Sequence, residues 1–142
     1  MHHASIRTAD IHRAIAFYEK LGFTLEERFT AGITLACWMT GLGGRIELLQ
    51  VPEPAPTVDA FHDEHYTGYY HLSFDLTEQV STLPHWLTDL QQRLAQSTPP
   101  MDFTGAFPPQ QQMIGPHVYE VLFIADTDGL PLEFLRMMDH GQ

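Results

Sequence analysis

Residues 69–76 read YYHLSFDL and repeat a pattern found at the start of the 142-residue chain. There, residues 3–7 read HASIR, so that in both stretches a histidine is followed two positions later by a serine. Polar and apolar residues alternate in each stretch, and successive side chains of a β-strand point to opposite faces. Each stretch therefore predicts a strand that turns one histidine, His3 or His71, away from its apolar face. The repeat indicates that the chain contains two copies of one structural unit.

Length and composition are typical of one compact domain with a substantial core. Hydrophobic residues make up 44% of the sequence and include nine Phe and two Trp. No apolar run approaches the roughly 18 residues of a membrane-spanning helix, and no basic-then-apolar leader is present, so we expect neither membrane insertion nor secretion. The only cysteine, Cys37, cannot form an internal disulfide, which suits the cytoplasm. We expect it to be a small buried side chain.

The charge balance narrows the range of partners. Eighteen acidic residues against seven Lys and Arg give a formal net charge of −11. This much negative charge disfavours contact with phosphate backbones and anionic lipids, so we expect no nucleic-acid partner and no membrane surface. A small-molecule substrate is the remaining expectation. An anionic one would need positive charge from a metal ion, Arg7 or Arg45.

The first half of the chain predicts the element order β-α-β-β-β. Asp10 stands where it would cap a helix whose apolar residues recur at helical spacing, and Gly22 stands where that helix would end. The sequence GLGG at 41–44 predicts a hairpin turn. The expected elements are a strand over 3–9, a helix over 11–21, and strands over 24–29, 33–40 and 45–51.

The second half predicts the same order after a linker over residues 52–68, which begins PEPAP. A helical stripe of apolar residues runs from Val80 to about Gln96, with Trp86 in the core, and a proline-rich loop over 99–109 follows, with a possible short strand near Phe103. The remaining strands are expected over 110–114, 117–125 and 130–136. The sequence thus predicts an α+β fold of two paired βαβββ modules, residues 1–51 and 69–142, in one domain spanning 1–142.

The last strand of each module carries a glutamate between large apolar residues. Glu47 lies in RIELL, residues 45–49, and Glu133 lies in PLEFL, residues 131–135. An unpaired carboxylate is costly to bury in such surroundings. Two imidazoles and two carboxylates form a suitable donor set for a divalent ion such as Zn²⁺, Ni²⁺, Mn²⁺ or Fe²⁺, whose charge the carboxylates would neutralise. The residues His3, Glu47, His71 and Glu133 are therefore the candidate metal ligands.

Five motifs resemble those of the vicinal oxygen chelate superfamily, which includes glyoxalase I, bleomycin-resistance proteins and extradiol dioxygenases. They are HASIRTAD at 3–10, AFYEKLGF at 16–23, IEL at 46–48, YHLSF at 70–74 and DTDGLPLE at 126–133. The resemblance covers nearly the whole chain. It implies paired βαβββ modules that form an open barrel-like cleft around a metal ion, with His3, Glu47, His71 and Glu133 as its ligands.

Within the superfamily, a His-Glu-His-Glu set resembles bacterial glyoxalase I. That resemblance implies a lyase or isomerase that stabilises an enediolate on the metal, with proton transfer by a glutamate. Glu133 is the first choice for this base and Glu47 the second. Arg7 falls where glyoxalase I contacts glutathione, which makes glutathione a candidate cosubstrate, although Val51 stands where an asparagine often contacts the same molecule. The family also implies a homodimer whose clefts combine modules from both subunits.

Other interpretations stay open. An extradiol-type dioxygenase acting on a catechol would use two histidines and one glutamate, and a small-molecule-binding resistance protein would need no catalytic metal. His3 could be a plain terminal residue and His71 a hydrogen-bonded strand residue. The HDEH sequence at 62–65 is expected to be a solvated loop. Three aromatic residues either line the cleft or fill the core: Trp38, Phe103 and Phe107.

Overall fold

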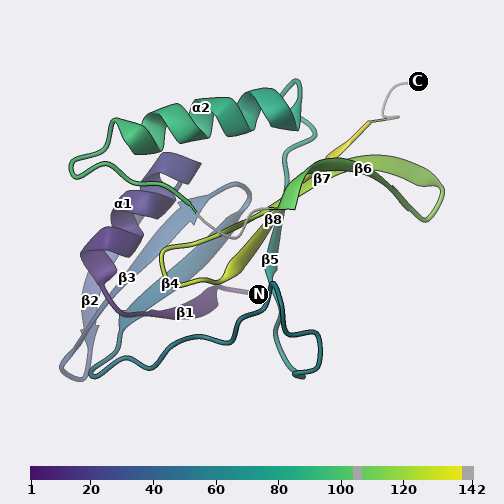
Figure 1. Ribbon diagram of the computed structural model, residues 1–142. Helices are drawn as coiled ribbons and strands as arrows, with labels where there is room; N and C mark the ends of the chain where they lie inside the picture. Colours follow the sequence, from purple (N-terminus) through teal and green to yellow (C-terminus); the bar gives the residue numbers. More distant parts are fainter. Residues whose placement is uncertain (104–106, 139–142) are drawn as a thin grey trace. The chain divides into compact units, whose positions relative to one another are not determined.

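The computed structural model describes residues 1–103 and 107–138 and divides the chain into two compact units, residues 1–57 and 58–142 (Figure 1). Each unit has the order β-α-β-β-β and contains one four-stranded mixed sheet with one helix. The predicted α+β class and the doubled βαβββ order are confirmed. The pairing of the two modules around an open cleft stays a prediction.

In the first unit the sheet has the strand order β1-β4-β3-β2. β1 runs parallel to β4, whereas β4, β3 and β2 are successively antiparallel. The parallel pairing brings the first and last strands of the module side by side. The elements are β1 (Ala4–Thr8), α1 (Ile11–Leu21), β2 (Thr24–Ala31), β3 (Thr34–Gly41) and β4 (Gly44–Gln50).

Helix α1 begins and ends where local chemistry requires. The side chain of Asp10 accepts a hydrogen bond from the backbone N–H of Arg13 at 3.1 Å, as a helix cap does. Gly22 ends the helix in the left-handed conformation with φ 119°, which glycine adopts at little cost. The apolar face packs against β2 and β4. Its buried residues are Ile11, Ala14, Ile15, Phe17, Tyr18 and Leu21.

The turn between β3 and β4 fits closely against the end of α1. Leu42 and Gly43 both have positive φ, 51° and 83°, as the predicted tight hairpin requires. A Cβ atom on Gly41 would lie 2.6 Å from the carbonyl oxygen of Gly22 and 2.8 Å from the Cα of Phe23. Only glycine at position 41 therefore lets the hairpin approach this backbone.

The second unit repeats the topology with the order β5-β8-β7-β6, and β5 is parallel to β8. Two predicted boundaries were wrong by three residues. The helix begins at Leu83 rather than Val80, because the side chain of Thr82 caps it by accepting from the N–H of His85 at 3.3 Å. The elements are β5 (Leu72–Asp75), α2 (Leu83–Ala95), β6 (Phe107–Ile114), β7 (His117–Ala125) and β8 (Pro131–Met137).

The other wrong boundary is the start of β6. The strand begins at Phe107 and includes Pro108 and Pro109, which the sequence predicted to lie in a loop. Its pairing with β7 shifts register between Phe107 and Gln110. Proline is tolerated here because β6 is an edge strand, where a missing N–H leaves no neighbour unpaired. The strand suggested near Phe103 is absent at that residue.

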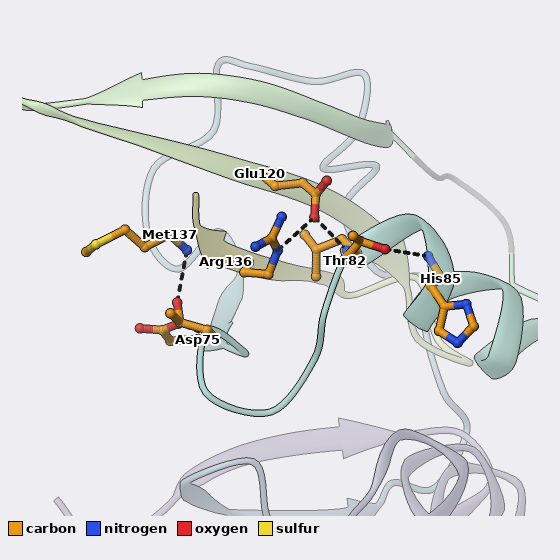
Figure 2. A network of polar contacts seen from close by, with 8 residues as sticks. Asp75, Thr82, His85, Glu120, Arg136 and Met137 are labelled. Atoms are coloured by element: carbon orange, nitrogen blue, oxygen red, sulfur yellow. Dashed lines mark hydrogen bonds and ion pairs between the residues drawn. The ribbon is translucent and has the colours of Figure 1, made fainter. Parts of the chain in front are cut away.

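A polar network ties the start of α2 to the sheet (Figure 2). The Oε1 atom of Glu120 on β7 accepts a hydrogen bond from the backbone N–H of Leu83 at 2.6 Å and another from Arg136 Nε on β8 at 3.2 Å. The ion pair between Glu120 and Arg136 is shielded from water. Its carboxylate also accepts a hydrogen bond from a backbone N–H that the first turn of the helix leaves without a partner. The charges of Glu120 and Arg136 therefore have a structural role, and neither residue needs a part in a functional site.

Residues 52–68 contain no helix or strand. Their role as a linker between two modules of one domain stays a prediction. Within residues 1–103 and 107–138, none of the helices combines the length and apolar character needed to cross a membrane.

Candidate metal centre

Strand pairing aligns a serine with a glutamate in each unit. In the ladder between β1 and β4, Ser5 is the partner of Glu47, and in the ladder between β5 and β8, Ser73 is the partner of Glu133. Partners in a ladder share a face of the sheet. The serine that accompanied each histidine in the sequence repeat therefore lies beside the glutamate of the same module.

The first unit brings His3 and Glu47 together. His3 Nε2 lies 3.6 Å from Glu47 Oε1, and the hydroxyl of Ser5 donates a hydrogen bond to the same oxygen at 2.7 Å. The histidine and glutamate side chains are 26% and 16% exposed. The pair is thus partly shielded from water but still open to it.

The second unit reproduces this arrangement with His71 and Glu133. His71 Nε2 lies 3.4 Å from Glu133 Oε1, and the hydroxyl of Ser73 donates to that oxygen at 2.5 Å. The side chains are 23% and 15% exposed. Two independent copies of one Ser-His-Glu arrangement, equal in geometry and burial, are unlike accidental ion pairs.

The spacing within each pair fits two donors of a shared ion. Two donors of one tetrahedral zinc ion, each about 2.0–2.1 Å from the metal, lie roughly 3.3 Å apart. The observed 3.4 and 3.6 Å are close to this value and longer than a normal hydrogen bond. The opposite ring nitrogen, His71 Nδ1, is buried and has no hydrogen-bond partner within the described ranges, so His71 lacks the outer partner that a metal-bound histidine usually has.

The surroundings of the first pair are polar. Trp38, the cross-strand neighbour of Glu47, lies with its indole Nε1 3.4 Å from Glu47 Oε2 and donates to it. His2 Nδ1 lies 2.7 Å from His3 Nδ1. When His3 donates through Nδ1, the lone pair on its Nε2 is available on the side of Glu47, which is the usual arrangement of a metal-binding histidine.

The surroundings of the second pair are aromatic. Phe123 is the cross-strand neighbour of Glu133, and its ring lies edge-on to His71 with centroids 5.0 Å apart. The ring of Tyr70 lies 4.6 Å from that of His71. Burial raises the pKa of the Tyr70 hydroxyl, and the negative charges of neighbours that include Glu133 raise it further, so this hydroxyl stays protonated.

The four predicted ligands therefore lie as two pairs, one in each unit. Across residues 1–103 and 107–138, no group of three or more His, Cys, Asp or Glu side chains is gathered in a form that would hold an ion. Each unit supplies one imidazole and one carboxylate.

The two arginines that the sequence singled out differ in their contacts. Arg7 is exposed on β1 and forms no ion pair with any described residue. Arg45 is held by Glu26, whose two carboxylate oxygens accept from its guanidinium at 3.1 and 3.3 Å. The same guanidinium lies 5.9 Å from the centre of the Trp38 ring. Arg45 is thus part of the support for the first pair, and Arg7 remains free to contact a ligand.

The HDEH segment lies in an irregular loop. His62 is 81% exposed and pairs with Asp59 at 2.9 Å. Within the second unit, residues of this loop and the next few border a pocket of about 360 Å³. Its lining consists of Ala60, Asp63, Glu64, Tyr66, Gly68 and Tyr70.

The aromatic residues left open by the sequence divide in their roles. Trp38 contacts the first pair, whereas Phe107 packs against Phe61 and Phe123, with ring centroids 5.3 and 5.9 Å away. Cys37 is fully buried, as expected, and burial raises the pKa of its thiol.

Sequence reasoning missed several residues around the two pairs. The serines were visible in the repeat, and their alignment with the glutamates follows once the first and last strands are taken as parallel neighbours. His2 and Phe123 had no signal in the sequence, and Trp38 was left open between cleft and core, because the positions of such residues depend on the register between strands.

A family model described as the glyoxalase/bleomycin resistance protein/dioxygenase superfamily matches residues 1–134. No curated protein sequence matches significantly.

Solved structures share the fold at low sequence identity. The glyoxalase family protein from Enterococcus faecalis is 19% identical with a TM-score of 0.70, over 96% of both chains. The trypanothione-dependent glyoxalase I of Leishmania major is 21% identical with a TM-score of 0.61, over 96% of this chain and 85% of that one. A mutant of the fosfomycin resistance protein FosX from Listeria monocytogenes, solved with Mn(II), is 12% identical with a TM-score of 0.58, over 94% of this chain and 89% of that one. The matched sequence and the shared fold agree: this chain belongs to the glyoxalase/bleomycin resistance protein/dioxygenase superfamily.

Proposed function

We propose that the protein is a metal-dependent vicinal oxygen chelate enzyme, nearest to glyoxalase I-like lyases and isomerases. The observation that carries the proposal is the duplicated Ser-His-Glu arrangement, in which both modules keep an imidazole and a carboxylate at the spacing of two donors to one ion. His3, Glu47, His71 and Glu133 would hold a divalent ion, Zn²⁺, Ni²⁺, Mn²⁺ or Fe²⁺. A protein that only binds small molecules would have no need to keep both pairs.

The protein's own groups have separate tasks in this proposal. A bound divalent ion would supply Lewis acidity toward the substrate's oxygens and so would acidify a neighbouring C–H bond. Glu133 takes this proton on its carboxylate and returns it to the adjacent carbon, so that the substrate is isomerised and the glutamate is regenerated. Glu47 is the second choice for the base. His3 and His71 act as neutral ligands, and Ser5 and Ser73 orient the carboxylates.

Metal binding is the first test. Protein freed of metal and titrated with each candidate ion by isothermal calorimetry is expected to bind at least one of them. Glu47→Gln and Glu133→Gln are each expected to weaken binding about 10-fold or more, whereas Glu53→Gln, in the exposed linker, serves as the matched control. A wild-type chain that binds none of the four ions would overturn the proposal.

Substrate assays separate the reaction classes. We expect turnover of methylglyoxal with glutathione, measured by thioester formation, when the preferred ion is present. Ring cleavage of a catechol with Fe²⁺, retained in Glu133→Gln, would instead establish the dioxygenase alternative, because that chemistry needs two histidines and one carboxylate. Turnover of neither substrate by the metal-loaded protein would reject both reactions.

Arg7 is the proposed contact for an anionic group of the substrate or of glutathione. Its guanidinium is exposed, is unpaired within the described residues, and lies on the strand that carries Ser5. Arg7→Ala is expected to raise KM for glutathione several-fold with little change in kcat. Arg13→Ala, on the exposed side of α1, is the control.

We also propose that the protein acts on a small-molecule substrate in the cytoplasm. Its one cysteine, Cys37, is a free thiol, so the fold requires no oxidising compartment. Cell fractionation would test the location.

A further inference from the structure

The two modules differ at one cross-strand position. Trp38 on β3 is the register partner of Glu47, and Phe123 on β7 is the register partner of Glu133. Since the two sheets have the same strand order, Trp38 and Phe123 occupy equivalent places. Their side chains differ in one respect that matters to a carboxylate: the indole has an N–H donor and the phenyl ring has none.

This difference changes how the two glutamates are held. Both oxygens of Glu47 have a donor, Ser5 on Oε1 at 2.7 Å and Trp38 on Oε2 at 3.4 Å. Glu133 receives only the hydroxyl of Ser73 on Oε1, and its Oε2 accepts no hydrogen bond from a described residue. A carboxylate anchored through both oxygens resists rotation, whereas one anchored through a single oxygen can turn about that bond.

Trp38 is itself fixed in place. Its ring contacts the rings of His2 and Phe29, with centroids 5.1 and 5.2 Å away, and the guanidinium of Arg45 lies 5.9 Å from its centre. Glu26 holds that guanidinium with two hydrogen bonds. The indole N–H therefore approaches Glu47 from a supported position, which makes it an effective second anchor.

We propose that Trp38 is a positioning residue that keeps Glu47 as a permanent metal ligand, and that Phe123 at the equivalent place leaves Glu133 free to leave the ion and carry the substrate proton. The inference rests on the proposed function. It assigns the base to the second module from the surroundings of the two carboxylates.

A reciprocal exchange tests the assignment. Trp38→Phe gives the first module the neighbour found in the second, and Phe123→Trp does the reverse. We expect W38F to weaken metal binding about 10-fold, measured by competition with a chromophoric chelator. We expect F123W to keep or tighten metal binding while lowering kcat about 10-fold or more, with KM changed little, because Glu133 gains a second anchor. Trp86→Phe makes the same change at the other tryptophan, a core residue of α2 whose ring packs on Phe134, and is the control for metal affinity.

The outcomes separate this inference from the proposed function. A wild-type chain without metal binding or turnover rejects the proposed function itself. A wild-type chain that binds metal and turns over substrate, with W38F at wild-type affinity or F123W at wild-type kcat, overturns the role of the exchanged pair. Should W38F not fold, as judged by circular dichroism, F123W alone decides: lower kcat at unchanged or tighter metal affinity supports the inference, and any other result overturns it.

Discussion

At the scale of single residues, Ser5 and Ser73 are the simplest part of the site to test. Each hydroxyl donates to the glutamate oxygen nearest its histidine, so its removal lets the carboxylate rotate. We expect Ser5→Ala and Ser73→Ala each to weaken metal binding about 10-fold, with the free energy of unfolding changed by less than about 1 kcal/mol. Calorimetric titration and urea denaturation measure the two quantities.

Ser81→Ala is the matched control, because Ser81 is exposed and lies outside both pairs. Wild-type metal affinity in both serine variants would show that the carboxylates need no orienting group.

The buried thiol of Cys37 gives a prediction about pH. Burial raises the thiol's pKa in the folded protein, so the folded state holds its proton more tightly than the unfolded chain. The stability that the neutral thiol contributes is complete below the pKa in the unfolded chain and is lost as pH rises toward the folded value. We expect slow labelling of folded protein by an aromatic disulfide reagent at mildly alkaline pH and rapid labelling in denaturant. Equal rates would mean that Cys37 is accessible.

At the scale of elements, the contact of Gly41 with the end of α1 makes a sharp prediction. A methyl group at this position would meet the Gly22 carbonyl and the Phe23 backbone, so we expect Gly41→Ala to destabilise the fold by about 1–3 kcal/mol. Gly44→Ala, three residues along the same hairpin, places its methyl group where no atom lies within 4 Å. Chemical denaturation of both variants is the measurement, and equal stability would contradict the close approach.

The prediction of helices and strands succeeded where the local signals in the sequence agreed. Helix α1 carries its apolar stripe, its cap and its terminal glycine in the sequence, and its bounds are as predicted. The start of strand β6 could not be recognised, because Pro108 and Pro109 are tolerated only through its place at the sheet edge, which local sequence does not reveal.

The candidate site shows the same division. The two His/Glu pairs could be predicted, because the sequence repeat identified the strands and the alternation of polar and apolar residues placed each histidine away from the apolar face. The roles of Trp38 and Phe123 could not, since these residues are ordinary aromatic strand positions until cross-strand register sets each opposite a glutamate. Register depends on bulges and turns, such as the shift between Leu25 and Glu27 in the pairing of β2 with β3.

At the scale of the whole molecule, the homodimer expected from the family would determine which pairs share an ion. We propose that His3 and Glu47 of one subunit meet His71 and Glu133 of the other. Mixing Glu47→Gln with Glu133→Gln after joint unfolding and refolding is then expected to restore about a quarter of wild-type activity, because half of the dimers are mixed and each holds one intact site.

Sites formed within single chains would give no such recovery, since each chain would carry one damaged ligand. Light scattering provides the second measurement, and a monomer at working concentrations would contradict shared sites. Recovery of activity together with a dimeric mass would support the proposed arrangement.

The exchange of tryptophan for phenylalanine at matching places in the two sheets has an evolutionary consequence. A duplicated fold contains the same ligand pair in two environments. The mobility of each carboxylate can then be changed by a residue on the neighbouring strand, while the ligands themselves stay the same. Divergence of catalytic behaviour among descendants of such a duplication would then begin in the aromatic residues that support the ligands.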